Sequence, residues 1–406
     1  MAAATWAGRA GAMLWALGAL VAAGWTLDFS LRSAVREDEA QAFAAAYADD
    51  GLVRLVRVLR GLGEEPGYQV ASKDAAAIRD TLVRHPLNAQ ALAVWGLSLA
   101  SRQQSEKAAL PFMTLADRVT RREPISQVWL IEAASAAGNV PEAIRHYNAA
   151  LATNPPLQAN LLPVLVGALD FPDVQQALRP YVRTAPWMPA YLAMASASAR
   201  TDSVLGLVSG GGAALATEAF APAQAMLIRR LAAEGRFDAA LGHASKVWSD
   251  FDRKAFPRFA VAAATLDPRL GGLSWTLADN EGMGASLEDG TVVATLEPLG
   301  RGAVLARDVP VQAGGAYQLI QTVAVDSGPR PASLRWRANC VPADPAQAAA
   351  EFWTQLVPTS QTATTYRTAF SVPAGCNLAH LELVAFGPEG QLPTSLRISG
   401  LDLVRN

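Results

Sequence analysis

The stretch that most constrains the fold runs from residue 124 to residue 155. It holds two segments whose apolar side chains recur at helical spacing, separated by Gly138 and Asn139. Gly138 can adopt the positive φ that ends a helix, and Pro155 cannot continue one. The stretch therefore predicts two short amphipathic helices joined by a Gly-Asn turn.

Residues 89–124 and about 221–252 repeat this order of features. Together the three stretches resemble the tetratricopeptide repeat, a helix-turn-helix unit of about 34 residues that stacks on copies of itself. The residues that carry the resemblance in the middle stretch are Leu130, Gly138, Asn139, Ala143, Tyr147, Ala150 and Pro155. Because one hairpin cannot bury its own apolar face, the resemblance implies an all-α helical-repeat solenoid. The alternative is an irregular helical bundle in which the matches are accidental.

In tetratricopeptide proteins the first helix of each repeat lines a groove that holds a peptide or a partner helix. The positions that the resemblance assigns to this groove are Gln90, Leu97, Val128, Glu132 and Arg229. First-helix residues are mostly small or apolar here, so the groove suits a helix, either from a protein partner or from this same chain. The alternative is that these side chains are buried inside the solenoid and bind nothing.

Residues 10–27 form an uncharged, mostly apolar run. It is long enough to cross a membrane as a helix, and Trp6 and Trp25 would then lie about 28 Å apart, near the two interfaces. The alternative is a cleaved signal peptide, since small residues occur near the end of the run. We expect an uncleaved single-pass anchor within residues 1–30, followed by a helical linker and the start of the solenoid at residues 31–88.

The chain has two cysteines, Cys340 and Cys376. A bridge between them would stabilise the fold by on the order of 4 kcal/mol and would persist in an oxidising compartment. The alternative is a pair of unpaired, buried thiols. Positive charges stand on both sides of residues 10–27, so charge counting does not fix the orientation. The cysteines favour a bacterial inner-membrane protein with most of its chain in the periplasm.

Beyond residue 267 the composition changes from Ala-Leu patterns to short runs rich in Val, Thr and aromatic residues. About eight strands are expected, which in this length indicate an all-β jelly-roll sandwich at residues 268–406, after helical repeats at residues 89–267. The expected strands span residues 273–277, 291–297, 303–309, 316–325, 333–339, 364–372, 379–386 and 395–404.

The strand edges of this region resemble carbohydrate-binding modules with a galactose-binding-like sandwich. The segments that carry the resemblance are residues 309–319, 370–373 and 398–403. It implies exposed aromatic rings on which a sugar stacks. Trp353 and its neighbour Phe352, in the expected loop between the cysteines, are the main candidates, and Trp275 is a weaker one. Trp336 alternates with arginines and is assigned to the core, and Trp353 would alternatively plug the space under a long loop.

Features of catalysis, metal binding and nucleic-acid binding are missing from the sequence. The formal net charge is −2, the four histidines are scattered singly, and no metal-ligand spacing or nucleophile motif occurs. The triple glycine at residues 210–212 lacks the Lys-Ser or Lys-Thr of a phosphate loop. We therefore expect neither a cofactor, nor a metal, nor a nucleic-acid partner, and no enzymatic activity.

These features predict a membrane-anchored periplasmic scaffold that acts in the assembly or export of an envelope polysaccharide. The repeats would hold a protein partner, and the sandwich would contact the polysaccharide; this second link comes from the fold resemblance alone. Two alternatives stay open. One is a divergent carbohydrate hydrolase with two facing carboxylates, and the other is an interaction module that binds no glycan.

Overall fold

The computed structural model describes residues 54–55, 57–59, 70–103, 106–254, 256, 258–261, 266–344 and 346–406. The predicted membrane segment at residues 10–27 and most of the linker that follows lie outside this part. Among the helices that are described, none combines the length and the apolar character that a membrane crossing requires. The chain divides into two compact units, Met1–Leu157 and Gln158–Asn406, and each is considered by itself.

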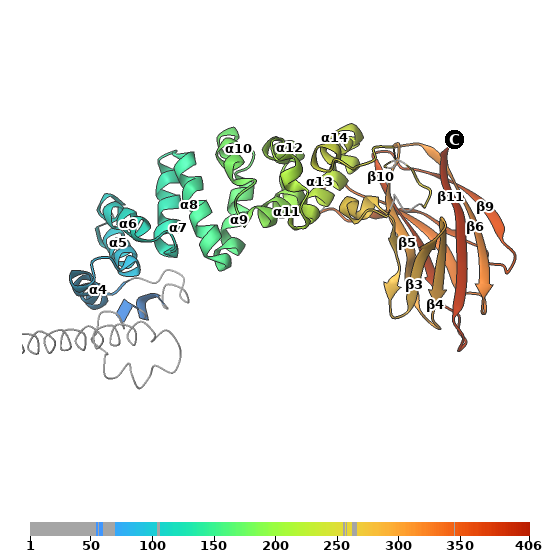
Figure 1. Cartoon of the computed structure of the whole chain (residues 1–406), viewed down its shortest axis with the longest axis horizontal. Coiled ribbons are helices and arrows are strands. Elements are labelled where there is room, and N and C mark those ends of the chain that lie inside the picture. Colours follow the sequence, from blue (N-terminus) through green and yellow to red (C-terminus); the bar gives the residue numbers. More distant parts are fainter. Residues whose placement is uncertain are drawn as a thin grey trace, which may run out of the picture. The chain divides into compact units, whose positions relative to one another are not determined.

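In the first unit, the residues that the structure describes form mainly a series of antiparallel helices (Figure 1). Close packing within the first hairpin depends on Gly96, because a Cβ at this position would lie 3.2 Å from Met113 Cε and 3.3 Å from Phe112 Cβ. The helices are α4 (Ser72–Arg84), α5 (Ala89–Gln103), α6 (Glu106–Val119), α7 (Pro124–Ala136) and α8 (Val140–Thr153), and the short 3-10 helix η2 (Pro155–Leu157) follows.

The hairpin of α7 and α8 confirms the prediction for residues 124–155. Gly138 has a φ of 70° and ends the first helix. Asn139 then caps the second helix, since its side chain accepts a hydrogen bond from the backbone N–H of Glu142. At the start of α7 the Glu123 carboxylate accepts from the N–H groups of Ile125 and Ser126 in the same way.

The second unit begins with further short helices, and prolines stand in the first turn of several of them, where no backbone N–H is needed. The last two helices repeat the turn geometry of the first unit, with Gly235 at a φ of 76°. The bounds are α9 (Gln158–Gly167), α10 (Pro172–Leu178), η3 (Arg179–Tyr181), α11 (Met188–Ser198), α12 (Thr201–Val208), η4 (Gly212–Leu215), η5 (Glu218–Phe220), α13 (Ala221–Ala233) and α14 (Phe237–Val247).

The helices of the second unit are followed by η7 (Pro268–Leu273) and a two-sheet antiparallel sandwich, which confirms the predicted change from helices to strands. One sheet has the order β1-β5-β10-β7-β8 and the other β2-β3-β4-β11-β6-β9. The strands are β1 (Thr276–Leu277), β2 (Asp279–Asn280), β3 (Met283–Glu288), β4 (Thr291–Leu296), β5 (Arg301–Pro310), β6 (Ala316–Ser327), β7 (Ser333–Cys340), β8 (Ala350–Leu356), β9 (Thr364–Ser371), β10 (Leu378–Phe386) and β11 (Thr394–Arg405).

Several strand assignments need correction. The strand expected at residues 273–277 is reduced to the two residues of β1, because residues 268–273 form a 3-10 helix. Strands β2 and β3 were not expected at all. Strand β8 replaces part of the loop expected between the cysteines, and it forms the edge of its sheet by pairing with β7.

Alternating side chains of both sheets fill the sandwich core. Trp336 is 1% exposed and its indole N–H donates to Gln321 Oε1, so its assignment to the core is confirmed. The disulfide between Cys340 and Cys376 is also confirmed, with 5.7 Å between the two Cα atoms. It ties the end of β7 to the segment that enters β10.

Candidate functional site

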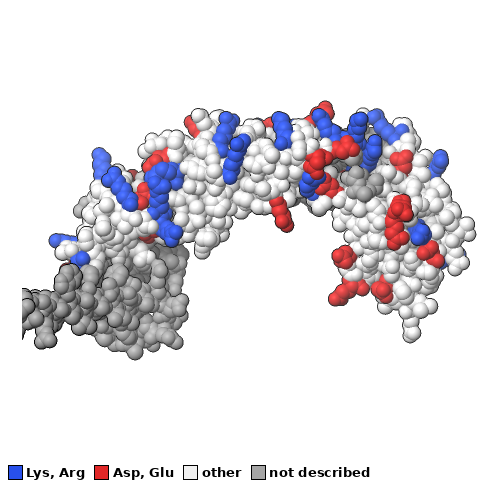
Figure 2. Space-filling model, in the orientation of Figure 1, with Lys and Arg blue, Asp and Glu red and all other residues white. Residues whose placement is uncertain are grey.

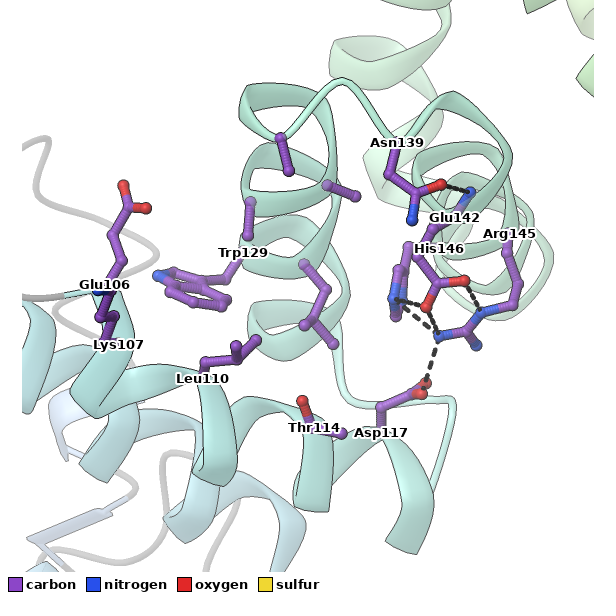
Figure 3. A pocket seen from close by; sticks show the side chains of 14 residues that line it. Glu106, Lys107, Leu110, Thr114, Asp117, Trp129, Asn139, Glu142, Arg145 and His146 are labelled. Carbon is purple, nitrogen blue, oxygen red and sulfur yellow. Dashed lines mark hydrogen bonds and ion pairs between the residues drawn. The ribbon is translucent and has the colours of Figure 1, made fainter.

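A cavity of about 340 Å³ lies in the first unit between α6, α7 and α8 (Figure 3). Its size falls within the roughly 300–1,000 Å³ of ordinary binding pockets. One wall is polar and comes from α8 and the end of α6. The other is largely apolar and comes from α7 and the middle of α6. The fold therefore presents a two-sided recess on its helical hairpins.

Arg145 is the centre of the polar wall. Its Nε and Nη2 donate to the two oxygens of Glu142 at 3.0 and 2.8 Å, and Nη2 also reaches Asp117 Oδ2 at 3.2 Å. Asp117 uses its second oxygen to accept from the amide of Gln127 at 2.8 Å. The wall is thus a connected hydrogen-bond network whose members come from three helices.

His146 completes this network in its neutral form. Nδ1 donates to Gln127 Oε1, and Nε2 accepts from Arg145 Nη2, both at 2.8 Å. Burial lowers the pKa of His146, and the nearby Arg145 charge adds to this effect. The hydrogen bond from Arg145 lowers the pKa of Glu142. Near neutral pH, the wall therefore carries two carboxylates against one guanidinium.

The apolar wall offers contact area to a ligand. Trp129 is half-buried, and its indole lies on the side of the cavity that faces Glu106 and Lys107 in Figure 3. Leu110 is 46% exposed, and Ala133 of α7 extends the same surface. The lining as a whole has three carboxylates and two cationic side chains, so it is slightly acidic. Such a recess suits an apolar side chain next to a basic one.

The predicted groove residues do not line this cavity. Gln90 and Leu97 lie on α5, and Val128 and Glu132 on α7; Glu132 is exposed and the other three are half-buried. The cavity uses other positions of α7, among them Trp129, which sequence reasoning missed. The only sequence feature that could have pointed to Trp129 is that a large aromatic residue stands next to the apolar face predicted for this helix.

The fifth predicted groove residue, Arg229, contacts the sandwich. It lies on α13 in the second unit, and its Nε donates to Asp308 Oδ2 on β5 at 2.5 Å. This guanidinium therefore faces the outer side of the sandwich. The helical spacing of apolar residues correctly predicted that Arg229 lies on a helix, but it could not identify the strand that Arg229 contacts.

The aromatic candidates of the sandwich are mostly buried. Trp275 is 4% exposed, donates to the carbonyl of Phe259 and packs edge-to-face on the Phe259 ring, so it offers no platform. Trp353 and Phe352 stand on β8 instead of in a loop, and both are half-buried. The Trp353 ring stacks on Phe370 at a centroid distance of 4.8 Å, so one of its faces is already covered.

The outer face of the five-stranded sheet is polar where β7 meets β10. His380 lies opposite Asn339, and Glu382 opposite Arg337. Arg337 pairs with Glu382 at 3.3 Å and with Glu351 of β8 at 2.8 Å. On the molecular face drawn in Figure 2, charged side chains of both signs are scattered over the helices, while much of the sandwich is uncharged.

No group of three His, Cys, Asp or Glu side chains that could hold a metal ion occurs in the described ranges. The sequence matches no family model, and it matches no curated protein.

Among solved structures, similarity is found to several sugar-binding modules. The N-terminal cellulose-binding domain of Cellulomonas fimi β-1,4-glucanase C is 11% identical, with 34% of this chain and 91% of that chain covered and a TM-score of 0.25. The CBM22-1 xylan-binding domain from Paenibacillus barcinonensis Xyn10C is 12% identical, with 32% and 85% covered and a TM-score of 0.23. A structure described as "CBM4 structure and function" is 12% identical, with 31% and 79% covered and a TM-score of 0.25. At such values the similarity says nothing about a ligand.

Proposed function

We propose that this protein is a non-enzymatic scaffold of the bacterial cell envelope. Its helical hairpins bind a protein partner, and its sandwich contacts a polysaccharide during assembly or export. Residues 10–27 anchor it in the inner membrane, with most of the chain in the periplasm. The observation that carries the proposal is the recess between α6, α7 and α8, about 340 Å³ in volume, with one apolar and one charged wall.

The recess has the properties of a peptide-binding site. Trp129 and Leu110 provide apolar area that water contacts in the free protein, and burying it would favour association. The network around Arg145 holds the polar wall in one arrangement, which reduces the ordering cost of binding. A partner segment with an aromatic or aliphatic side chain beside a Lys or Arg matches both walls.

The tetratricopeptide interpretation is supported by the turns. Gly138 and Gly235 both adopt a positive φ between two packed helices, at φ values of 70° and 76°. The pairs α7–α8 and α13–α14 thus share the local geometry that the repeat requires. The periplasmic location is supported by the disulfide, because such bridges persist in oxidising compartments.

A peptide-binding experiment tests the role of the recess. The purified chain is titrated with fluorescent peptides that carry a Trp or Leu beside a Lys or Arg. Replacing Trp129 by Ala removes the main apolar anchor, and a loss of about 2 kcal/mol, or roughly 30-fold in Kd, is expected. Leu87→Ala is the matched control, because Leu87 is 68% exposed and does not line the recess.

The proposal for the recess fails if no such peptide binds, or if Trp129→Ala and Leu87→Ala weaken binding equally.

Two alternatives remain for the sandwich, namely a carbohydrate hydrolase and an interaction module without glycan binding. Release of reducing sugar from a glycan by the purified chain would favour the hydrolase. The polar row on β7 and β10, which includes Arg337, Asn339 and Glu382, favours contact with sugar hydroxyls.

A further inference from the structure

A second cavity, of about 270 Å³, lies within the second unit, between α13 and the outer face of the sheet at β7 and β10. Its volume is close to the lower limit of roughly 300 Å³ for ordinary small-molecule pockets, so it suits a single sugar-sized group. The side chains that matter for the argument are Met226, Arg229, Arg230, Asn339, Gln347 and His380. The last two of these lie on the loop after β7 and on β10.

The cavity carries an excess of positive charge. Arg229 and Arg230 line it, and no carboxylate of the described residues does; Asp308, which is 1% exposed, lies behind two lining residues, and both of its oxygens are occupied. Oδ2 accepts from Arg229 Nε at 2.5 Å, and Oδ1 lies 2.7 Å from His380 Nδ1. The hydrogen bond to Asp308 raises the pKa of His380. Burial favours a higher pKa for Asp308, but the bonds from His380 and Arg229 outweigh it and keep the pKa low.

Arg230 adds a charge that its own contacts do not neutralise. Its Nη1 donates to the carbonyl oxygens of Ser196 and Ala199, each at 2.8 Å, at the end of α11. Both acceptors are neutral. Its Nε is buried and has no hydrogen-bond partner among the described residues. None of these contacts balances the Arg230 charge with a carboxylate, and this charge favours an anion in the cavity that Arg230 lines.

The walls of the cavity are held in place by three cross-links. The disulfide fixes Cys340, at the start of the loop that carries Gln347, to the entry of β10. Next to it, the Asn377 amide donates to the carbonyl of Ala233 at the end of α13, at 3.3 Å. The bond from Arg229 to Asp308 joins the same helix to β5. The site is therefore formed before a ligand arrives.

We infer that this cavity binds the carboxylate of an acidic sugar, as in a glycan that contains hexuronic acid residues. Guanidinium groups match a carboxylate in charge and in hydrogen-bond geometry. The Asn339 amide can bond a sugar hydroxyl, and so can the Gln347 amide oxygen, while the Gln347 Nε2 donates to Asp344 Oδ2 at 3.4 Å. The inference rests on the proposed contact of the sandwich with a polysaccharide, and it narrows that polysaccharide to an acidic one. An acidic peptide is the competing ligand, and the test includes it.

The test is a calorimetric titration of the full purified chain with oligogalacturonate. Fully methyl-esterified oligogalacturonate is the matched probe, because it keeps the sugar chain and removes the charge. Gln347→Glu places a negative charge at an exposed cavity position, and about tenfold weaker binding of the acidic probe is expected. Gln361→Glu makes the same charge change at an exposed position that does not line the cavity, and binding should be unchanged.

Selective binding of the acidic probe that Gln347→Glu weakens and Gln361→Glu does not would support the inference. If both probes bind equally, or if the two variants behave alike, the inference is wrong while the glycan contact stands. If neither probe binds and a set of neutral glycans also fails, the proposed polysaccharide contact fails with it. If only a glutamate-rich peptide binds and Gln347→Glu weakens it, the cavity serves a protein ligand and the inference is overturned.

Discussion

The contact between α13 and β5 provides a quantitative test of the packing in the second unit. Arg229 is 39% exposed, whereas the Asp308 side chain that it contacts is 1% exposed. Arg229→Gln removes the charge and leaves His380 as the ionisable side chain that is hydrogen-bonded to Asp308. Removing one partner of a fully buried ion pair costs about 3–5 kcal/mol. Because Arg229 is partly solvated and His380 still bonds Oδ1, about 2 kcal/mol is expected here.

The cost should depend on pH through His380. Asp308 raises the pKa of His380 in the folded protein. The stabilisation that the His380–Asp308 contact provides is therefore fully present below the unfolded-state pKa of about 6.5, and it is lost as the pH rises through the folded-state pKa. Below that range His380 is charged and compensates Asp308 in the variant. Asp308 has a lowered pKa, so its own contribution is lost only in stronger acid. Arg229→Gln should therefore cost less near about pH 6 than near about pH 8.5.

Urea unfolding of the purified chain measures this cost, with pulsed hydrogen exchange and mass spectrometry on peptides from α13 and β5. The local readout separates the second unit from the rest of the chain. Arg397→Gln is the control, since Arg397 pairs with Asp326 at 3.3 Å while both side chains are 49% exposed, and less than about 1 kcal/mol is expected. Equal costs for the two variants, or a cost for Arg229→Gln that does not change with pH, would refute the reasoning.

Three further predictions concern stability. Burial and, to a smaller degree, Lys246 lower the pKa of His243 to about 4. The free energy of unfolding should therefore fall by up to roughly 3 kcal/mol as the pH falls from about 6.5 to about 4. In thermal melts, His243→Gln should reduce this pH dependence. Reducing the bond between Cys340 and Cys376 should lower stability by about 4 kcal/mol, seen as a lower urea midpoint with reductant. Gly138→Ala should cost about 1 kcal/mol in thermal melts, because its φ is 70° although nothing lies within 4 Å.

The helical hairpin at residues 124–155 was predictable because its signals are local. Gly138 and Asn139 define the turn through their own conformational and capping properties, and neither depends on a distant contact. Prolines at the starts of α10 and α11 act in the same local way. Alternation similarly identified β7, since Trp336 points inward between two outward arginines, Arg335 and Arg337.

Strand β8 was not predictable from alternation. It is an edge strand, most of its side chains are exposed, and a register shift between Ala338 and Asn339 of β7 interrupts the pairing. Edge strands need no buried row, so their sequences lack the period of two. Trp353 pairs with Ala338 of β7, and its ring stacks on Phe370. Both contacts are with residues distant in the sequence, so local sequence patterns could not predict them.

The sites depend on long-range contacts to an even greater degree. Periodicity assigned Arg229 to a helix face, but its partner Asp308 lies 79 residues away along the chain. The network of Arg145 likewise joins Asp117, which is 28 residues distant. Helical spacing shows which residues share a face, and tertiary packing decides what covers that face.

The two cavities differ in the sign of their uncompensated charge, and this difference bears on the proposed scaffold role. In the first cavity, the guanidinium of Arg145 is hydrogen-bonded to two carboxylates. In the second, the single carboxylate of Asp308 is hydrogen-bonded to both Arg229 and His380, and Arg230 adds a further positive charge. Like charges across an interface are strongly disfavoured, so a basic peptide is excluded from the second cavity and an acidic sugar from the first. Saturating either cavity should leave the Kd of the other ligand unchanged. Competition between the peptide and oligogalacturonate would mean that they share one site, and the assignment of separate ligands would then be wrong.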